Sequence, residues 1–420
     1  MTPESRLSLT RRIVVTGLIL TLGGCAASPT ASPTAASPTA PASPSPEPSA
    51  AAANPSPVVT PNTSASPTAE ASCAERTLAG MTEAQRIGQV LMIGLEKDAL
   101  NAAERAAVAD FHVGSFAFTT QSRAGVKAIR ALTDDVQALA TRESTAGVGF
   151  FVAANQEGGL IQGLGGAGFD VIPSALDQGS MSVATLRQKA ARWGRQLAQA
   201  GVNLDLAPVA DVVPPGTDGT NAPIGQLHRE YGHDPSTAAS HVAAFIGGMT
   251  QAGIATSAKH FPGLGRVAGN TDVTGDVVDS VTTRDDPFLQ PFAAAIDGGV
   301  PFVMVSLATY TQIDPDHLAV FSPTIVDGML RGDRGFDGVV ISDALGATAV
   351  ASIPPGTRAI DFLGAGGDMI ISNKTPPAIE MIKAVAARVA SDDEFRARVD
   401  DAAMHVLRAK EAAGLLTCGG

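Results

Sequence analysis

Short apolar runs alternate with stretches of helical periodicity from about Met81 to the C-terminal end of the chain. This alternation predicts parallel strands joined by crossover helices. The eight predicted strands are Val90–Gly94, Gly114–Phe118, Val148–Ala153, Val202–Leu206, Ile254–Ala258, Phe302–Val305, Gly338–Ile341 and Asp368–Ile371. The predicted helices between them include Ser122–Ala140, Val183–Ala200, Pro235–Ala252, Pro287–Asp297 and Ser322–Leu330.

A (β/α)₈ barrel, which is an α/β fold, has eight strands that alternate with helices, and we predict that architecture. An open, doubly wound sheet is the alternative. No Gly-x-Gly-x-x-Gly or phosphate-binding loop sequence follows any of the runs, and this weakens the alternative. Ahead of the first strand, Thr82 and Gln85 have the spacing of a capping box, which predicts a helix that begins near Thr82.

The N-terminal segment differs from the rest of the chain. Arg6, Arg11 and Arg12 precede the apolar run Ile13–Leu22, which is too short to span a bilayer comfortably. The run leads into Leu-Gly-Gly-Cys, which resembles a bacterial lipobox. We therefore expect a lipoprotein signal peptide at residues 1–24 and lipidation of Cys25, which would anchor an extracytoplasmic protein to the bacterial cell membrane. An ordinary signal peptide with an incidental cysteine is the alternative.

Residues 25–72 consist almost entirely of Ala, Ser, Pro and Thr. Such a segment has too little apolar bulk to offset the entropy of ordering, so we predict a disordered tether, followed by one domain at residues 73–420. The net charge of −12 argues against nucleic acid and anionic lipid as partners. No second hydrophobic stretch has membrane-spanning length, so we expect membrane contact only through the lipid anchor. We also expect a monomer.

Cys73 and Cys418 lie at the two edges of the predicted domain. An exported chain meets an oxidising environment, so a disulfide between them is expected. Two free thiols are the alternative. The bridge requires the two ends of the domain to meet, as they do when a barrel pairs its first strand with its last.

Polar residues follow most of the predicted strands, where barrel enzymes place their chemistry. Asn155 and Glu157 follow the third strand, and Lys259 and His260 follow the fifth on a loop rich in glycine and proline. The other strand-end residues are Asp211, Ser306 and Asp343. Asp343 has the position of a nucleophile, a metal ligand, a general base or a helix cap. No His/Asp/Glu cluster has the spacing of metal ligands, so we expect neither a metal nor a cofactor.

Several motifs together resemble the barrel domain of family 3 glycoside hydrolases. They are Ala154-Asn-Gln-Glu-Gly-Gly, Asn203-Leu-Asp-Leu-Ala-Pro-Val-Ala-Asp, Lys259-His-Phe-Pro-Gly, Leu289–Val305 and Phe336–Leu345. The resemblance runs from about Met81 to Leu415. It is greatest to the branch of single-domain β-N-acetylglucosaminidases, or β-N-acetylhexosaminidases.

This resemblance implies a retaining mechanism in which Asp343 attacks the sugar and forms a glycosyl-enzyme. It implies that Lys259, His260 and Arg229 bind sugar hydroxyls, with Asn155 and Glu157 as further candidates. The family's acid/base loop carries Asp-Ser-His, whereas this chain has Asn270-Thr271-Asp272. Two arginines of the family pattern are also replaced, by Leu160 and Gly163.

Two hypotheses follow from this mixture of retained and replaced residues. In the first, Asp272 replaces the missing histidine, and the protein hydrolyses β-linked sugars or muropeptides derived from the cell wall. In the second, the barrel is catalytically impaired and binds such ligands without hydrolysing them. Retention of Asp343, Lys259 and His260 favours the first hypothesis.

Overall fold

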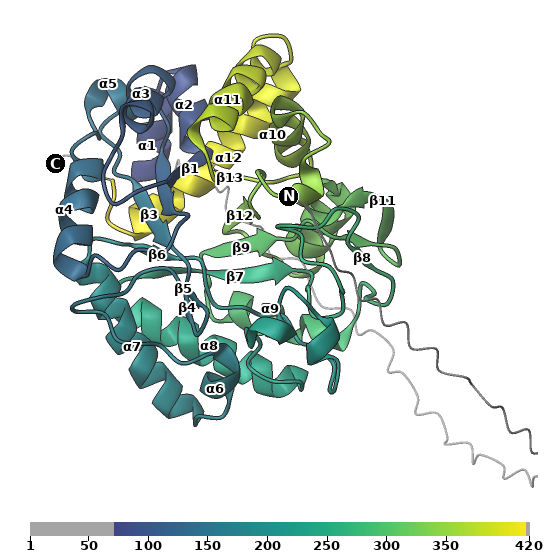
Figure 1. Ribbon diagram of the computed structural model, residues 1–420. Coiled ribbons are helices and arrows are strands. Elements are labelled where there is room, and N and C mark those ends of the chain that lie inside the picture. The colour runs from purple at the N-terminus through teal and green to yellow at the C-terminus, as the bar shows by residue number, and fades with distance from the viewer. Residues whose placement is uncertain (1–70, 417–420) are drawn as a thin grey trace, which may run out of the picture. The chain divides into compact units, whose positions relative to one another are not determined.

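The computed structural model describes residues 71–416 (Figure 1). The predicted signal peptide at 1–24, Cys25, the tether up to residue 70, and Cys418 lie outside the described residues. Within residues 71–416, no helix has both the length and the apolar character needed to cross a bilayer. Cys73 is buried and disulfide-bonded. Because Cys418 is not described, its pairing with Cys73 stays a prediction.

Eight parallel strands form the central sheet, and each lies beside its neighbours in chain order. They are β1 (Leu91–Leu95), β2 (Ser115–Phe118), β3 (Phe151–Ala154), β6 (Leu204–Asp205), β7 (Ala255–Phe261), β9 (Phe302–Val305), β12 (Val339–Ser342) and β13 (Ile370–Ser372). The last strand, β13, pairs with β1, and Ser342 N–H donates to Met369 O across the remaining seam. The sheet therefore closes into the predicted (β/α)₈ barrel.

The structure corrects the end of the fifth predicted strand. β7 continues to Phe261, so Lys259 and His260 belong to the strand itself and not to the loop after it. The reason is that the backbone of Lys259 is paired with the neighbouring chain segment: its N–H donates to Pro208 O at 3.1 Å, and its carbonyl accepts from Ala210 N–H at 2.6 Å. Both site residues are thereby fixed by the sheet.

Helices form a ring around the strands (Figure 1). They are α1 (Cys73–Gly80), α2 (Glu83–Gln89), α3 (Ala102–Phe111), α4 (Val126–Gln137), α5 (Arg142–Thr145), α6 (Ala175–Gly179), α7 (Val183–Gln199), α8 (Pro235–Gln251), α9 (Gln290–Asp297), α10 (Pro355–Gly364), α11 (Thr375–Val389) and α12 (Asp393–Ala412). The predicted capping box is confirmed, since Thr82 Oγ1 accepts from Gln85 N–H and Gln85 Oε1 accepts from Thr82 N–H. The predicted helix at Ser322–Leu330 is instead a π-helix, η5 (Thr324–Asp333).

Two small sheets lie outside the barrel. The hairpin β4 (Gln156–Gly158) and β5 (Ile161–Gln162) follows β3 directly. The other sheet contains β8 (Val278–Asp279), β10 (Thr309–Tyr310) and β11 (Asp314–Leu318).

Side chains along each strand alternate between two apolar clusters, as the pleat requires. The cluster inside the barrel includes Met92, Phe151 and Phe302. The rings of Phe151 and Phe302 pack edge to face there, with their centroids 5.2 Å apart. Their neighbours, including Val152 and Val303, pack in the larger cluster that joins the strands to the helices.

The last helix closes the N-terminal end of the barrel. Val406 of α12 packs into the interior cluster. One turn further on, Lys410 is fully buried, and its Nζ donates to Gln89 Oε1 and Gly114 O, each at 2.7 Å. With this end filled by side chains, the C-terminal end of the strands is the place for a ligand.

The buried lysine predicts a pH-dependent stability. Burial lowers the pKa of Lys410 from 10.5 to about 7. Between these values the unfolded chain holds the proton and the folded chain does not, so the contribution of Lys410 to the unfolding free energy rises with pH. The rise is limited to about 1.4 kcal/mol per pH unit.

Urea unfolding of Lys410→Met at pH 6 and pH 9 tests this expectation. The stability of the variant relative to the wild type should fall as the pH rises. Lys127→Met, which changes an exposed lysine, should show no such trend. An identical pH dependence for wild type and Lys410→Met would contradict the assignment.

Candidate active site

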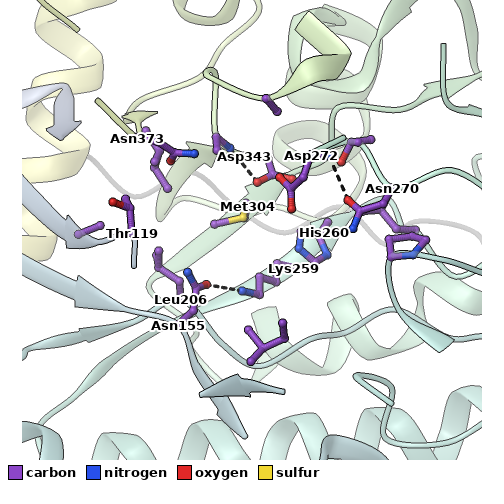
Figure 2. A pocket seen from close by; sticks show the side chains of 18 of the residues that line it. Thr119, Asn155, Leu206, Lys259, His260, Asn270, Asp272, Met304, Asp343 and Asn373 are labelled. Atoms are coloured by element: carbon purple, nitrogen blue, oxygen red, sulfur yellow. Dashed lines mark hydrogen bonds between the residues drawn. The ribbon is translucent and has the colours of Figure 1, made fainter. Parts of the chain in front are cut away.

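A cavity of about 430 Å³ opens at the C-terminal end of the barrel strands (Figure 2). Its volume lies in the ~300–1,000 Å³ range of small-molecule sites. The polar residues that line it come from several strand ends and two loops: Thr119, Asn155, Arg229, Lys259, His260, Asn270, Thr271, Asp272, Asp343 and Asn373. The structure thus brings together most of the predicted site residues.

Glu157 holds the two cations of the cavity in place. Its carboxylate, on the hairpin strand β4, receives Arg229 Nε on one oxygen and Arg229 Nη2 on the other, both at 2.8 Å. Lys259 Nζ lies 2.6 Å from Oε1 of the same carboxylate and also donates to Asn155 Oδ1 at 2.7 Å. The paired contacts from one guanidinium are the strongest ion-pair geometry available to a carboxylate.

The charge of Glu157 is stabilised by its partners. Burial alone would raise the pKa of this carboxyl group, but the charges and hydrogen bonds of Arg229 and Lys259 outweigh burial and lower the pKa to about 2. The side chain of Glu157 is only 3% exposed, and the residue does not line the cavity. We therefore interpret Glu157 as a residue that positions Arg229 and Lys259, and not as a sugar contact.

Lys259 and His260 are consecutive in β7, yet both line the cavity. In a regular strand, successive side chains point to opposite faces. The register between β7 and β9 shifts between Lys259 and Phe261. A shift of this kind re-aims a side chain, so the irregularity accounts for two neighbouring contacts on one face.

Asp211 orients the His260 ring. The Nδ1 of His260 lies 2.8 Å from Asp211 Oδ2, and the other carboxylate oxygen accepts the backbone N–H groups of His260 and Leu264. Because Asp211 offers only acceptors, Nδ1 is the donor to Asp211 and Nε2 is the ring nitrogen left for other partners. Sequence reasoning noted Asp211 only as a strand-end residue and did not predict its contact with His260.

Asp343 lines the cavity directly after β12. Its backbone N–H donates to Val305 O at 3.0 Å, which fixes the residue to the neighbouring strand, and its Oδ1 accepts from Ala344 N–H at 2.7 Å. The residue is half-buried. A carboxylate fixed at a strand tip and open to a cavity has the position of a nucleophile.

Asp272 comes to the same wall from the loop after β7 (Figure 2). The loop is attached to the segment after β12, because Thr348 N–H donates to Asp272 O at 3.2 Å and Ala349 N–H donates to Thr271 O at 3.1 Å. The pKa of Asp272 is raised, mainly because the carboxyl group is partly removed from water. The negative charge of Asp343 is the second cause. Solvent limits this rise, because Asp272 is exposed overall.

Other strand-end residues divide between the cavity and the interior. Ser306 is fully buried and hydrogen-bonds to the Tyr310 hydroxyl, and it does not line the cavity. Thr119 and Asn373, which follow β2 and β13, do line it although sequence reasoning did not select them. Their positions after strands were the available signal.

Three comparisons relate this site to known proteins. The model of the glycosyl hydrolase family 3 N-terminal domain matches residues 82–409. The crystal structure of a β-N-acetylhexosaminidase from Beutenbergia cavernae is 48% identical, with a TM-score of 0.77, over 79% of this chain and 99% of that chain. A β-hexosaminidase of Stenotrophomonas maltophilia is 29% identical over 71% of this chain and 88% of its own length. A β-hexosaminidase of Xylella fastidiosa is 32% identical over 56% of this chain and 71% of its own length.

The arrangement around Glu157 predicts a large cost for removing its charge. Glu157→Gln leaves Arg229 and Lys259 buried without a counter-charge, and we expect a loss of about 3 kcal/mol of unfolding free energy. Urea denaturation measures this loss. The control Asp134→Asn breaks an exposed pair with Arg130 and should cost about 0.5 kcal/mol or less. Equal effects of the two substitutions would contradict the role given to Glu157.

Proposed function

The chain belongs to glycosyl hydrolase family 3, and on that basis we propose that it is a retaining β-N-acetylglucosaminidase. Asp343 is the nucleophile and Asp272 is the acid/base. The observation that carries the proposal is that these two carboxyl groups line one cavity, where the charge of Asp343 contributes to the raised pKa of Asp272. The reaction requires one carboxyl group with a raised pKa as the acid and a second carboxylate as the nucleophile.

In the first step, an Asp343 carboxylate oxygen attacks the anomeric carbon, and the bond to the leaving oxygen breaks. Asp272 gives its proton to that oxygen, so the aglycone departs as an alcohol. In the second step, Asp272 takes a proton from water, and the hydroxyl group displaces Asp343 from the sugar. Both carboxyl groups return to their starting states.

Lys259, Arg229, His260 and Asn155 supply the polar groups for a bound sugar. All four line the cavity. Glu157 and Asp211 act through these residues by fixing their orientation. Hydrogen bonds to sugar hydroxyls from positioned groups lower the barrier by orienting the anomeric carbon toward the nucleophile.

We further propose that the protein acts on cell-wall-derived β-linked sugars or muropeptides in the bacterial envelope. The support is the lipobox-like sequence at Cys25 and the Ala/Ser/Pro/Thr-rich segment that follows it. A tether of this composition would place the barrel away from the membrane surface and within the wall.

One prediction of the proposed function concerns the nucleophile. Asp343→Asn should lower kcat for a chromogenic β-N-acetylglucosaminide by about 10³-fold or more, because the amide cannot form the glycosyl-enzyme. Its binding of N-acetylglucosamine, measured by calorimetry, should persist. Asp276→Asn, which changes an exposed carboxylate of the same loop as Asp272, should retain activity. If the wild type binds the sugar but has no turnover on β-N-acetylglucosaminides or β-glucosides, the non-catalytic binding barrel is the correct function.

Another prediction of the proposed function concerns the acid. A general acid must be protonated, so kcat/KM should fall as the pH rises through the pKa of Asp272, which lies above the ordinary aspartate value. In Asp272→Asn, the alkaline limb of the pH profile should disappear. The activity of this variant on a substrate with a poor leaving group should fall by about 10²–10⁴-fold. The loss should be smaller for a nitrophenyl glycoside, and azide should restore part of it. An unchanged pH profile in the variant would assign the acid to another group, such as His260.

A further inference from the structure

A second cluster of ligating side chains lies in the long loop between β6 and α8, outside the cavity described above. Asp218, at the start of the short helix η1 (Asp218–Thr220), meets Glu230 and His233. One ligand atom from each of the three side chains lies within 4.8 Å of the other two. None of the three residues lines the candidate active site.

Glu230 is the unusual member of this cluster. The residue is 0% exposed, and among the described residues no donor makes a hydrogen bond to Oε1 or Oε2. A buried carboxyl group without a partner is rare in folded proteins because its desolvation is costly. It therefore needs a proton or a cation.

The neighbouring imidazole has the orientation of a metal ligand. His233 Nδ1 lies 3.1 Å from Val213 O, which assigns the proton to Nδ1 and leaves the lone pair on Nε2. That Nε2 lies 3.7 Å from Asp218 Oδ1, a buried oxygen that also has no hydrogen-bond partner within residues 71–416. A backbone carbonyl that holds the second ring nitrogen is the usual support for a histidine ligand.

We propose that Asp218, Glu230 and His233 bind one divalent transition-metal ion of the Zn²⁺ class. One imidazole nitrogen and two carboxylate oxygens match the ligands of Zn²⁺, whereas Mg²⁺ and Ca²⁺ prefer oxygen ligands alone. Bonds of about 2.1 Å place tetrahedral ligands about 3.5 Å apart, so small side-chain rotations would complete the site. Asp218 and His233 are each 34% exposed, which gives the ion a path and leaves room for water as a fourth ligand.

The proposed ion would crosslink the loop that carries Arg229. Glu230 directly follows Arg229 in the chain, and the guanidinium of Arg229 forms an ion pair with Glu157. No metal-ligand cluster was expected from the sequence spacing, yet the fold brings Asp218, Glu230 and His233 together. The sequence spacing hides the cluster because the loop between Asp218 and Glu230 has to fold back on itself. The inference does not depend on the proposed glycosidase activity.

Zn²⁺ binding by the untagged, chelator-treated full chain tests the proposal. Calorimetry and elemental analysis should give one Zn²⁺ per chain, and Zn²⁺ should raise the melting temperature, as a ligand of the folded state does. Each of three substitutions removes a ligand and should weaken Zn²⁺ binding by about tenfold or more: Glu230→Gln, His233→Ala and Asp218→Asn. Mg²⁺ at the same concentration should leave the melting temperature unchanged.

Two controls separate this site from other sources of binding. His317→Ala changes a different histidine–carboxylate pair, in which His317 Nδ1 lies 3.1 Å from Asp314, and it should retain Zn²⁺ affinity. Asp343→Asn should also retain it, because the ion does not use the cavity carboxylates. The proposal is wrong if Zn²⁺ does not bind saturably or if the three ligand variants bind it as the wild type does.

Discussion

The buried contact of one carboxylate with two cations is the constraint on which the rest of the site depends. Glu157, Arg229 and Lys259 come from a hairpin, a long loop and a barrel strand, and their ion pairs join these three elements. Charges removed from water are tolerated only when each has its partner in good geometry. The three side chains are therefore stable only as a set, and the set fixes the positions from which Arg229 and Lys259 face the cavity.

The opposite wall of the cavity is held differently. Asp343 is fixed by its position at the tip of β12 and by its backbone bond to β9. Asp272 reaches the same wall on a loop that is attached through two backbone hydrogen bonds to residues 348 and 349. Loops held by few contacts open more readily than strands do. The site thus combines a carboxyl group fixed at a strand tip with a second carboxyl group carried by a loop, and loops over active sites can close on a bound ligand.

Much of this architecture could be predicted from the sequence. The eight predicted runs correspond to the eight barrel strands because strands buried on both faces form short, mostly apolar runs of residues. Strand-end residues such as Asp343 and Asn155 were predicted because chemistry in barrels gathers at that edge. The role of Glu157, the partnership of Asp211 with His260, and the cluster around Glu230 could not be predicted. Each depends on the path of a loop or hairpin in space, which hydrophobic periodicity does not encode.

The central claim is that Asp343 becomes covalently linked to a sugar held above the triad of Glu157, Arg229 and Lys259. The most direct measurement is mass spectrometry of the protein after incubation with a fluorinated N-acetylglucosaminyl donor that forms the intermediate faster than it hydrolyses. We expect one added sugar per chain, located by peptide mapping on Asp343. No covalent adduct, or an adduct on a different residue, would contradict the account.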